Sequence, residues 1–240
     1  MTDADIRSLS NAEVAQLPVD RLAVLVLRDA VQGSAWNWRN WCLEFAQDRT
    51  REGLAAAQNA IAEAWGWLQA KTLVSTKGTG GSYDFHDFYV TRAGQQALER
   101  GLGYVRAVIR LDVELVESLE QKVRPQFLLG DFELAAFAAM REVEITVRDQ
   151  GGLGNDLVGV PLMQNAFREG GPLHDPEVHP GESVAQMNLF AGAMGLFKNP
   201  ASHRRVDYDD PVEASEVILL ADLLLRMLQR QAAGRPAGDE

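Results

Sequence analysis

The segment Lys198-Asn199-Pro200-Ala201-Ser202-His203-Arg204-Arg205 separates two patterned stretches and determines where the C-terminal helices end and begin. Because Pro200 disfavours the α conformation at Asn199, we predict that a helix over 183–198, N-capped by Ser183, ends or kinks there. Its apolar residues recur every three or four positions, which places them on one helix face. They are Val184, Met187, Phe190, Met194 and Phe197.

Downstream of this segment, Asp210-Pro211-Val212-Glu213 is typical of a helix start. Asp210 is the expected N-cap, Pro211 the first helical residue and Glu213 the third, as in a capping box. The helix predicted over 211–230 also has one apolar face. That face consists of Val217, Leu220, Leu224, Met227 and Leu228.

The junction between these helices brings together residue types that can cleave a phosphodiester without a metal. A cation such as Lys198 can hold phosphate, an amide such as Asn199 can orient it, and the His203 imidazole can move protons near neutral pH. The alternative is an ordinary helix stop, in which Lys198 complements the C-terminal helix dipole and His203 is solvated.

The C-terminal half resembles the HEPN superfamily of all-helical domains and, more narrowly, the bacterial Ymh family. The resemblance covers roughly residues 112–232 and ends in the Asn-Pro and nearby His of the junction. It departs from the HEPN pattern at its first position, where Lys198 replaces an arginine and loses the bidentate fork that fits phosphate. The other matching residues are Gly130 to Ala136, Glu142, Val147-Arg148, Pro161 to Phe167 and Leu189 to Ala193.

This resemblance implies a metal-independent endoribonuclease with no cofactor, acting in antiviral defence or as a toxin. It implies RNA as substrate and a homodimer through the C-terminal domain, in which two copies of the motif share one groove. The catalytic residues would be His203, Lys198 and Asn199, and the substrate-binding residues Arg204, Arg205 and Glu142. The alternative is a HEPN-like dimerisation and binding module without catalysis, whose N-terminal domain recruits a protein partner or DNA.

The N-terminal part is predicted to form helices over 18–31 and 52–71, a β-hairpin over 73–91, and a helix over 92–100. Glycines at 78, 80 and 81 favour the hairpin turn. Three tryptophans lie within six residues, and their spacing favours the core of a small helical domain over a base-stacking platform. They are Trp36, Trp38 and Trp41.

Residues 18–101 resemble a winged helix-turn-helix domain, on the helix 60–68 and on the strand exit Val90-Thr91-Arg92-Ala93-Gly94. DNA-reading helices normally present basic or amide side chains to base edges. The helix before the predicted wing has no basic series, which favours a protein partner or weak nucleic-acid contact over operator binding. Its polar residues are Gln58, Asn59, Glu63 and Gln69.

The predicted fold class is therefore mainly α, a winged helix-turn-helix domain over 1–101 followed by an all-α HEPN-like bundle over 112–232. Residues 102–111 are the expected linker or connecting-helix start, and 233–240 a disordered tail. Within the bundle we predict helices over 104–123 and 131–149, then a loop-rich insert. In that insert, His174 and His179 with nearby carboxylates suggest a metal site, but Pro176 and the lack of a helical register favour a solvated loop.

The net charge of −11 over 240 residues argues against non-specific electrostatic binding of nucleic acid by the whole surface. Ten Lys and Arg stand against twelve Asp and Glu in residues 1–101, and thirteen against twenty-two in the rest, so the second half is the more acidic. Any nucleic-acid contact must therefore use a local basic patch. The single cysteine, Cys42, and the absence of a signal-like or membrane-spanning segment predict a cytoplasmic protein without membrane association.

Overall fold

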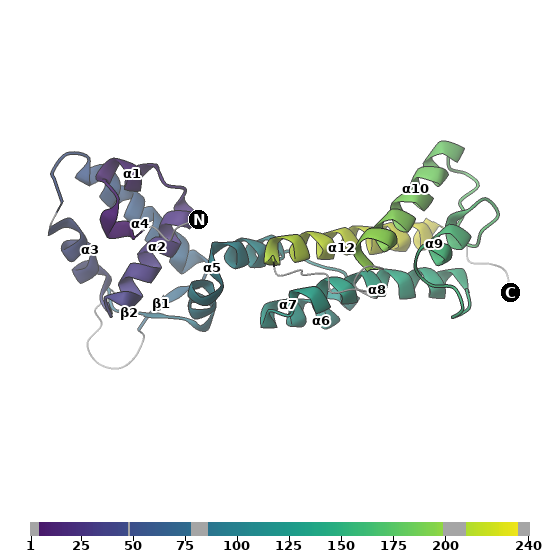
Figure 1. The fold of residues 1–240 in the computed structure, drawn as a ribbon, viewed down its shortest axis with the longest axis horizontal. Coiled ribbons are helices and arrows are strands. Elements are labelled where there is room, and N and C mark those ends of the chain that lie inside the picture. Colours follow the sequence, from purple (N-terminus) through teal and green to yellow (C-terminus); the bar gives the residue numbers. More distant parts are fainter. Residues whose placement is uncertain (1–4, 48, 78–85, 199–209, 235–240) are drawn as a thin grey trace. The chain divides into compact units, whose positions relative to one another are not determined.

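The computed structural model describes residues 5–47, 49–77, 86–198 and 210–234, which are mainly α-helical (Figure 1). The chain divides into two compact units, Met1–Val105 and Arg106–Glu240. The boundary between the two units lies after Val105, inside the segment 102–111 that was expected to be a linker or the start of a connecting helix. In the described residues, no helix is both long enough and apolar enough to cross a bilayer. The predicted mainly α fold class is confirmed.

The first unit is helical around one short hairpin. Strands β1 (Val74–Thr76) and β2 (Phe88–Val90) pair antiparallel, with Val74 opposite Val90. A further bridge joins Asn37 to Asp87, so the segment around residue 37 pairs with the other edge of the β2 region. The two strands and the helices α2, α4 and the start of α5 match the sequence prediction, whereas η1, α1 and α3 were not predicted. The helical elements are η1 (Ile6–Ser8), α1 (Asn11–Gln16), α2 (Val19–Gln32), α3 (Trp38–Gln47), α4 (Leu54–Ala70) and the start of α5 (Arg92–Arg110).

Tryptophans form the centre of this unit. Trp38 stacks on Trp65 with ring centroids 4.0 Å apart and on Trp41 with centroids 5.2 Å apart. Trp65 in turn meets the edge of Phe88 on β2. Only 2% of Trp41 is exposed, whereas 55% of Trp36 is exposed. The core interpretation is therefore confirmed for Trp38 and Trp41, and is wrong for Trp36.

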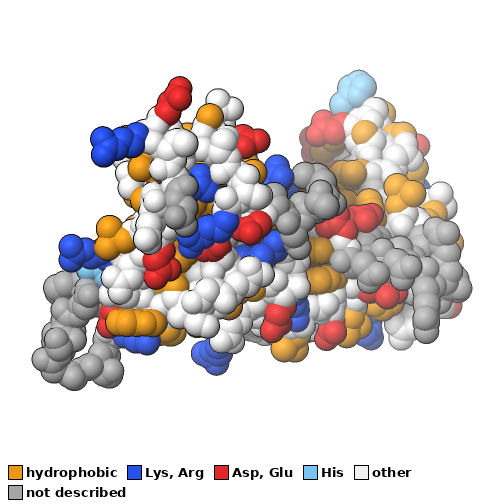
Figure 2. All heavy atoms as spheres, turned by 60° about the vertical axis from the view of Figure 1, so that its left-hand side comes forward, with side chains coloured by type: hydrophobic (Ala, Val, Ile, Leu, Met, Phe, Trp, Pro, Cys, Tyr) orange, Lys and Arg blue, Asp and Glu red, His pale blue; other side chains and the backbone are white. Residues whose placement is uncertain are grey.

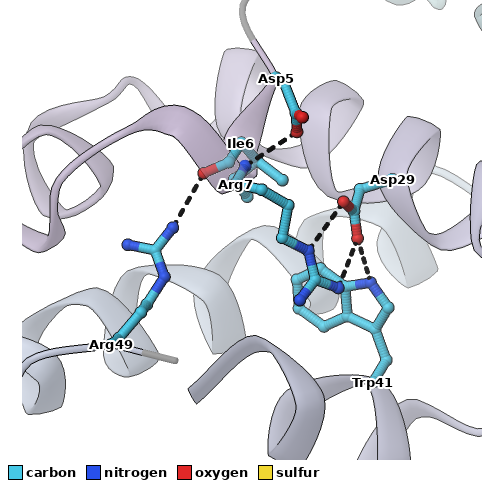
Figure 3. Close-up of polar contacts among 6 residues, drawn as sticks. All are labelled: Asp5, Ile6, Arg7, Asp29, Trp41 and Arg49. Atoms are coloured by element: carbon cyan, nitrogen blue, oxygen red, sulfur yellow. Dashed lines mark hydrogen bonds and ion pairs between the residues drawn. The ribbon is translucent and has the colours of Figure 1, made fainter. Parts of the chain in front are cut away.

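The N-terminal residues are held against these helices by charged and aromatic side chains (Figure 3). Arg7 binds Asp29 through two hydrogen bonds of 2.9 and 2.8 Å, and the Trp41 indole N–H donates to the same carboxylate at 2.7 Å. Arg49 donates to the Ile6 carbonyl at 2.9 Å and lies 3.9 Å over the Phe45 ring. These groups are mutually satisfied, so this cluster has a structural role.

Helix α5 is broken at Gly101, whose φ of 80° and ψ of −178° lie in a region that only glycine adopts readily. The predicted single helix over 104–123 is wrong, because α5 ends at Arg110 and α6 (Glu117–Lys122) starts after a non-helical segment. Side chains bind the backbone of that segment. Arg124 donates to the Val113 carbonyl at 2.7 Å, and Asp222 accepts the Val116 N–H at 2.7 Å.

The second unit packs α8, α10 and α12 around one hydrophobic core, as predicted. That core includes Met140 of α8, Phe190 of α10 and Leu224 of α12, none of which is measurably exposed. Figure 1 shows α8 and α12 running side by side, and they pack against each other. The remaining elements are α7 (Arg124–Leu129), α8 (Phe132–Gly151), α9 (Gly159–Phe167), α10 (Pro180–Ala193), the π-helical turn η2 (Met194–Lys198) and α12 (Pro211–Gly234).

Two of the predicted helix starts have different outcomes. Asp210 does cap α12, since its carboxylate accepts the Val212 N–H at 2.8 Å. Ser183 does not cap α10, because that helix begins earlier, at Pro180. The cap is His179, whose ring Nδ1 accepts the Gly181 N–H at 3.1 Å, and Pro180 has the fixed φ that suits a first helical residue.

Candidate functional site

Of the six residues that the sequence proposes as a site, Lys198 and Glu142 lie in the part of the chain that the structure describes. Asn199, His203, Arg204 and Arg205 lie outside the described residues. The geometry of the site is therefore that of its first residue, Lys198, and of the side chains that hold it.

Lys198 is the last residue of η2, the π-helical turn that continues α10. A π turn contains one residue more per hydrogen-bonded ring than an α turn, and such turns are frequent at functional sites. The turn is fixed from inside by Met194, which is fully buried. Gly195 lies against Val160 of α9, where an added Cβ would come within 3.4 Å of the valine side chain. The end of the α10–η2 segment thus packs closely on α9.

The Lys198 ammonium forms an ion pair with Glu144 of α8, with Nζ 3.0 Å from Oε2. Glu144 is only 6% exposed. Its other oxygen accepts a hydrogen bond of 2.9 Å from Arg148, one turn further along α8. The backbone N–H of Gly159 donates to Oε2 at 3.0 Å. We call Glu144, Arg148, Lys198 and the Gly159 N–H the Glu144 cluster.

The Glu144 cluster joins the consecutive helices α8 and α9 to η2, which is distant from both in sequence. Arg148 also donates to the Leu157 carbonyl at 3.0 Å, which ties the loop before α9 to α8. Gly159 starts α9 with φ +58°, a left-handed conformation that costs glycine little and other residues more. A single carboxylate on α8 therefore positions the start of α9 and the end of η2.

The surroundings of the Glu144 carboxylate act on its pKa in opposite directions. Burial alone would raise its pKa, but hydrogen bonds from Arg148, Lys198 and the Gly159 N–H outweigh burial, so the pKa is lowered from its ordinary value. Two cations share this one carboxylate, which gives the cluster a net positive charge. The Arg148 Nε atom is buried and has no hydrogen-bond partner among the described residues.

Glu142 lies elsewhere on α8. Two residues along an α-helix correspond to a turn of about 200°, so positions 142 and 144 face different sides. The Glu142 carboxylate binds Lys122 of α6, with its oxygens 3.0 and 2.8 Å from Nζ. The structure thus brings Lys198 to Glu144, and places Glu142 at the packing of α8 against α6. The substrate-binding role of Glu142 stays a prediction.

Glu144 itself was not predicted as a site residue, although the sequence contains a signal for it. It lies four residues after the core residue Met140 and four before Arg148, so it continues a buried face with a charged pair. A carboxylate in line with a core stripe requires a buried partner. Its second partner, Lys198, is 54 positions away and could not be deduced from helical spacing.

On the face shown in Figure 2, Lys and Arg side chains are interspersed with Asp and Glu among the coloured residues. In the described ranges, no three His, Cys, Asp or Glu side chains come close enough to hold a metal ion. His179 serves as the cap of α10, and His174 lines a pocket between the end of α9 and the start of α10.

Residues 114–228 match a family model described as "Protein of unknown function (Hypoth_ymh)". The resemblance to the Ymh family is confirmed for this segment. It contains Glu142, the whole Glu144 cluster and the junction 198–205. No curated protein matches the chain, and no solved structure matches it.

Proposed function

We propose that the C-terminal unit is a metal-independent endoribonuclease of HEPN type, with its active site at the junction 198–205. The observation that carries the proposal is the Glu144 cluster. It fixes Lys198 at the end of a π-helical turn, one residue before the Asn-Pro of the junction. An ordinary helix stop needs only a solvated lysine at the helix end. Here a buried carboxylate, which is costly to desolvate, holds the lysine and also binds two other elements.

The mechanism follows from the chemistry of the junction residues. His203 takes the proton from a ribose 2′-hydroxyl, whose oxygen attacks the adjacent phosphorus, and a protonated imidazole returns a proton to the departing 5′-oxygen. Lys198 and Arg204 stabilise the charge that develops on the phosphorane oxygens. Asn199 orients a phosphate oxygen, and Arg205 adds positive charge for RNA binding. The products are a 2′,3′-cyclic phosphate and a 5′-hydroxyl.

The pairing of Lys198 with Glu144 has a consequence for this mechanism. A phosphate that binds Lys198 competes with the Glu144 carboxylate, and Arg148 is positioned to keep Glu144 neutralised when it does. Glu144 and Arg148 would therefore act as positioning residues. The roles proposed in defence or as a toxin require a nuclease that is restrained until it is triggered, and a paired lysine fits that requirement.

A homodimer through the C-terminal unit is part of the proposal. Two large apolar side chains are exposed on this segment, Leu196 of η2 at 68% and Leu189 of α10 at 41%. Their burial against a second copy would remove apolar surface from water and so favour association. Two junctions that met across a dimer would gather Lys198, Arg204 and Arg205 from both chains, which would create a local basic patch on an acidic protein.

The first unit is proposed to be a winged helix that recruits a partner. Two observations support this proposal. The helices α2, α3 and α4 precede the β1–β2 hairpin along the chain, and a third segment pairs beside β2 at residue 37. The outer face of α4 has no Lys or Arg, and its polar side chains are exposed. This favours a protein partner over DNA. The exposed polar residues are Gln58, Asn59, Glu63 and Gln69.

A non-catalytic dimerisation and binding module is the second candidate. It is favoured by Lys198 in place of the arginine of the HEPN pattern, because lysine lacks the planar fork that fits phosphate. The test incubates the purified protein and its His203→Ala variant with mixed cellular RNA in excess chelator. Cleavage by the first protein alone, with 2′,3′-cyclic phosphate ends, supports the nuclease, and Lys198→Arg should cleave at least as well because it restores the planar fork. Equal RNA cleavage by the unmodified protein and His203→Ala, or no cleavage by either, would favour the binding module.

A further inference from the structure

A pocket of about 520 Å³ lies between the end of α9, the loop that follows it, and the first turns of α10. It is away from the Glu144 cluster, none of whose residues lines it. Its walls are mostly apolar. The apolar lining residues are Phe167, Pro176, Val178, Pro180, Val184 and Met187.

Two polar side chains that line this pocket each have one atom without a hydrogen-bond partner in the described part of the chain. The Ser183 hydroxyl oxygen and the His174 Nδ1 atom are both buried, and neither forms a hydrogen bond to any described residue. Ser183 as a whole is only 9% exposed. A buried polar atom without a partner costs about 1–3 kcal/mol, so two in one pocket call for an explanation.

The backbone hydrogen bonds near these two residues are made by other groups. The backbone N–H groups of Glu182 and Ser183 both donate to the His179 carbonyl, at 2.8 and 3.1 Å. The His174 backbone N–H donates to the Gly171 carbonyl at 3.0 Å. These backbone bonds do not involve the Ser183 hydroxyl or the His174 Nδ1 atom, which remain for a bound molecule.

We propose that this pocket binds a small uncharged molecule with an apolar body and one oxygen-bearing head group. The apolar walls would take the body, and Ser183 Oγ and His174 Nδ1 would bind the oxygen. Arg168 and Glu169 both line the pocket and carry opposite charges. The pocket therefore favours neither an anionic nor a cationic head group. Ligand sites are commonly of this kind, with apolar walls and a few convergent polar groups. The proposal is independent of the ribonuclease activity.

The experiment uses the full chain labelled with ¹³C at the methionine methyl groups, and follows each methyl by NMR. Met187 lines this pocket and Met227 lines a different one, so Met227 is an internal control. The probes are benzyl alcohol, toluene, which lacks the hydroxyl, and benzoate, which carries a charge. We expect benzyl alcohol to shift the Met187 signal saturably, to leave Met227 unchanged, and to bind more tightly than the other two probes.

Matched variants test the polar pair. Ser183→Ala and His174→Phe should each weaken benzyl alcohol binding about three- to tenfold, the effect of one lost hydrogen bond, and leave toluene binding unchanged. Unchanged signals of the buried Met140 and Met163 would show that each variant is folded. The proposal is overturned if Met187 does not respond, if toluene or benzoate binds as tightly as benzyl alcohol, or if both folded variants bind like the parent protein.

Discussion

Glu144 is the residue on which three donors from three elements converge, and its removal should have a large effect on stability. Glu144→Gln keeps the shape of the side chain but leaves Arg148 and Lys198 without their counter-charge. We expect a loss of about 3 kcal/mol in the free energy of unfolding, the usual consequence of breaking a buried pair on one side. Urea denaturation followed by circular dichroism measures it.

Glu142→Gln is the matched control on the same helix. Its partner Lys122 is 58% exposed at the side chain, so the pair is largely solvated. We expect a loss of less than about 1 kcal/mol from this change. Equal losses from the two substitutions would mean that the Glu144 cluster is not the anchor that its burial indicates.

Glu144 should also make stability depend on acid pH. Its pKa in the folded protein is lowered from the ordinary value of 4.5, so the unfolded chain binds the proton more readily. The stabilisation is therefore complete above pH 4.5 and is lost as the pH falls through the lower, folded-state pKa. Over the pH range from 4.5 down through the folded-state pKa, the parent protein should lose more stability than Glu144→Gln does. Parallel slopes of the two proteins in this range would contradict the assignment.

Two glycines give opposite predictions at the scale of the helices. Gly101 breaks α5 with φ 80° and ψ −178°, so Gly101→Ala should destabilise the protein by about 1–3 kcal/mol. Gly66 lies inside α4, and a Cβ added there meets no described atom within 4 Å. Gly66→Ala should therefore stabilise by about 0.5–1 kcal/mol. Thermal unfolding of both variants measures the difference, and a stabilising Gly101→Ala would show that α5 does not need its break.

The helices that sequence predicted well are those with a strong local pattern. Asp210 and Pro211 define the start of α12, and the apolar periodicity of 131–149 defines α8. The prediction failed where distant groups decide the structure. The helix expected over 104–123 is broken because Asp222 and Arg124 bind its backbone, and no spacing within the segment reveals that.

At the candidate site, too, the sequence predicts what depends on neighbouring residues and misses what depends on residues far along the chain. The junction containing Lys198 is visible in sequence because it includes Pro200 and is flanked by two patterned helices. Its partner is not, because the choice between Glu142 and Glu144 depends on how α8 is rotated in the core. That rotation is set by packing against α9 and α12, which only the folded chain provides.

At the scale of the whole molecule, the proposed dimer makes a prediction that a single-chain site does not. If two junctions share one groove, Lys198→Met and His203→Ala each inactivate the homodimer. A mixed dimer of the two variants, however, retains one lysine and one imidazole around the phosphate. Mixing the variants under conditions of subunit exchange should therefore restore part of the RNA cleavage that neither shows alone.

The measurement needs the mass of the protein beside its activity. Sedimentation at micromolar concentration should give twice the chain mass for the parent protein and for both variants, and RNA cleavage should rise with the fraction of mixed dimer. A monomeric mass would remove the shared groove. Dimers that exchange subunits and stay inactive, when the parent protein cleaves, would place a complete site on each chain, because only a site confined to one chain is insensitive to what its partner supplies.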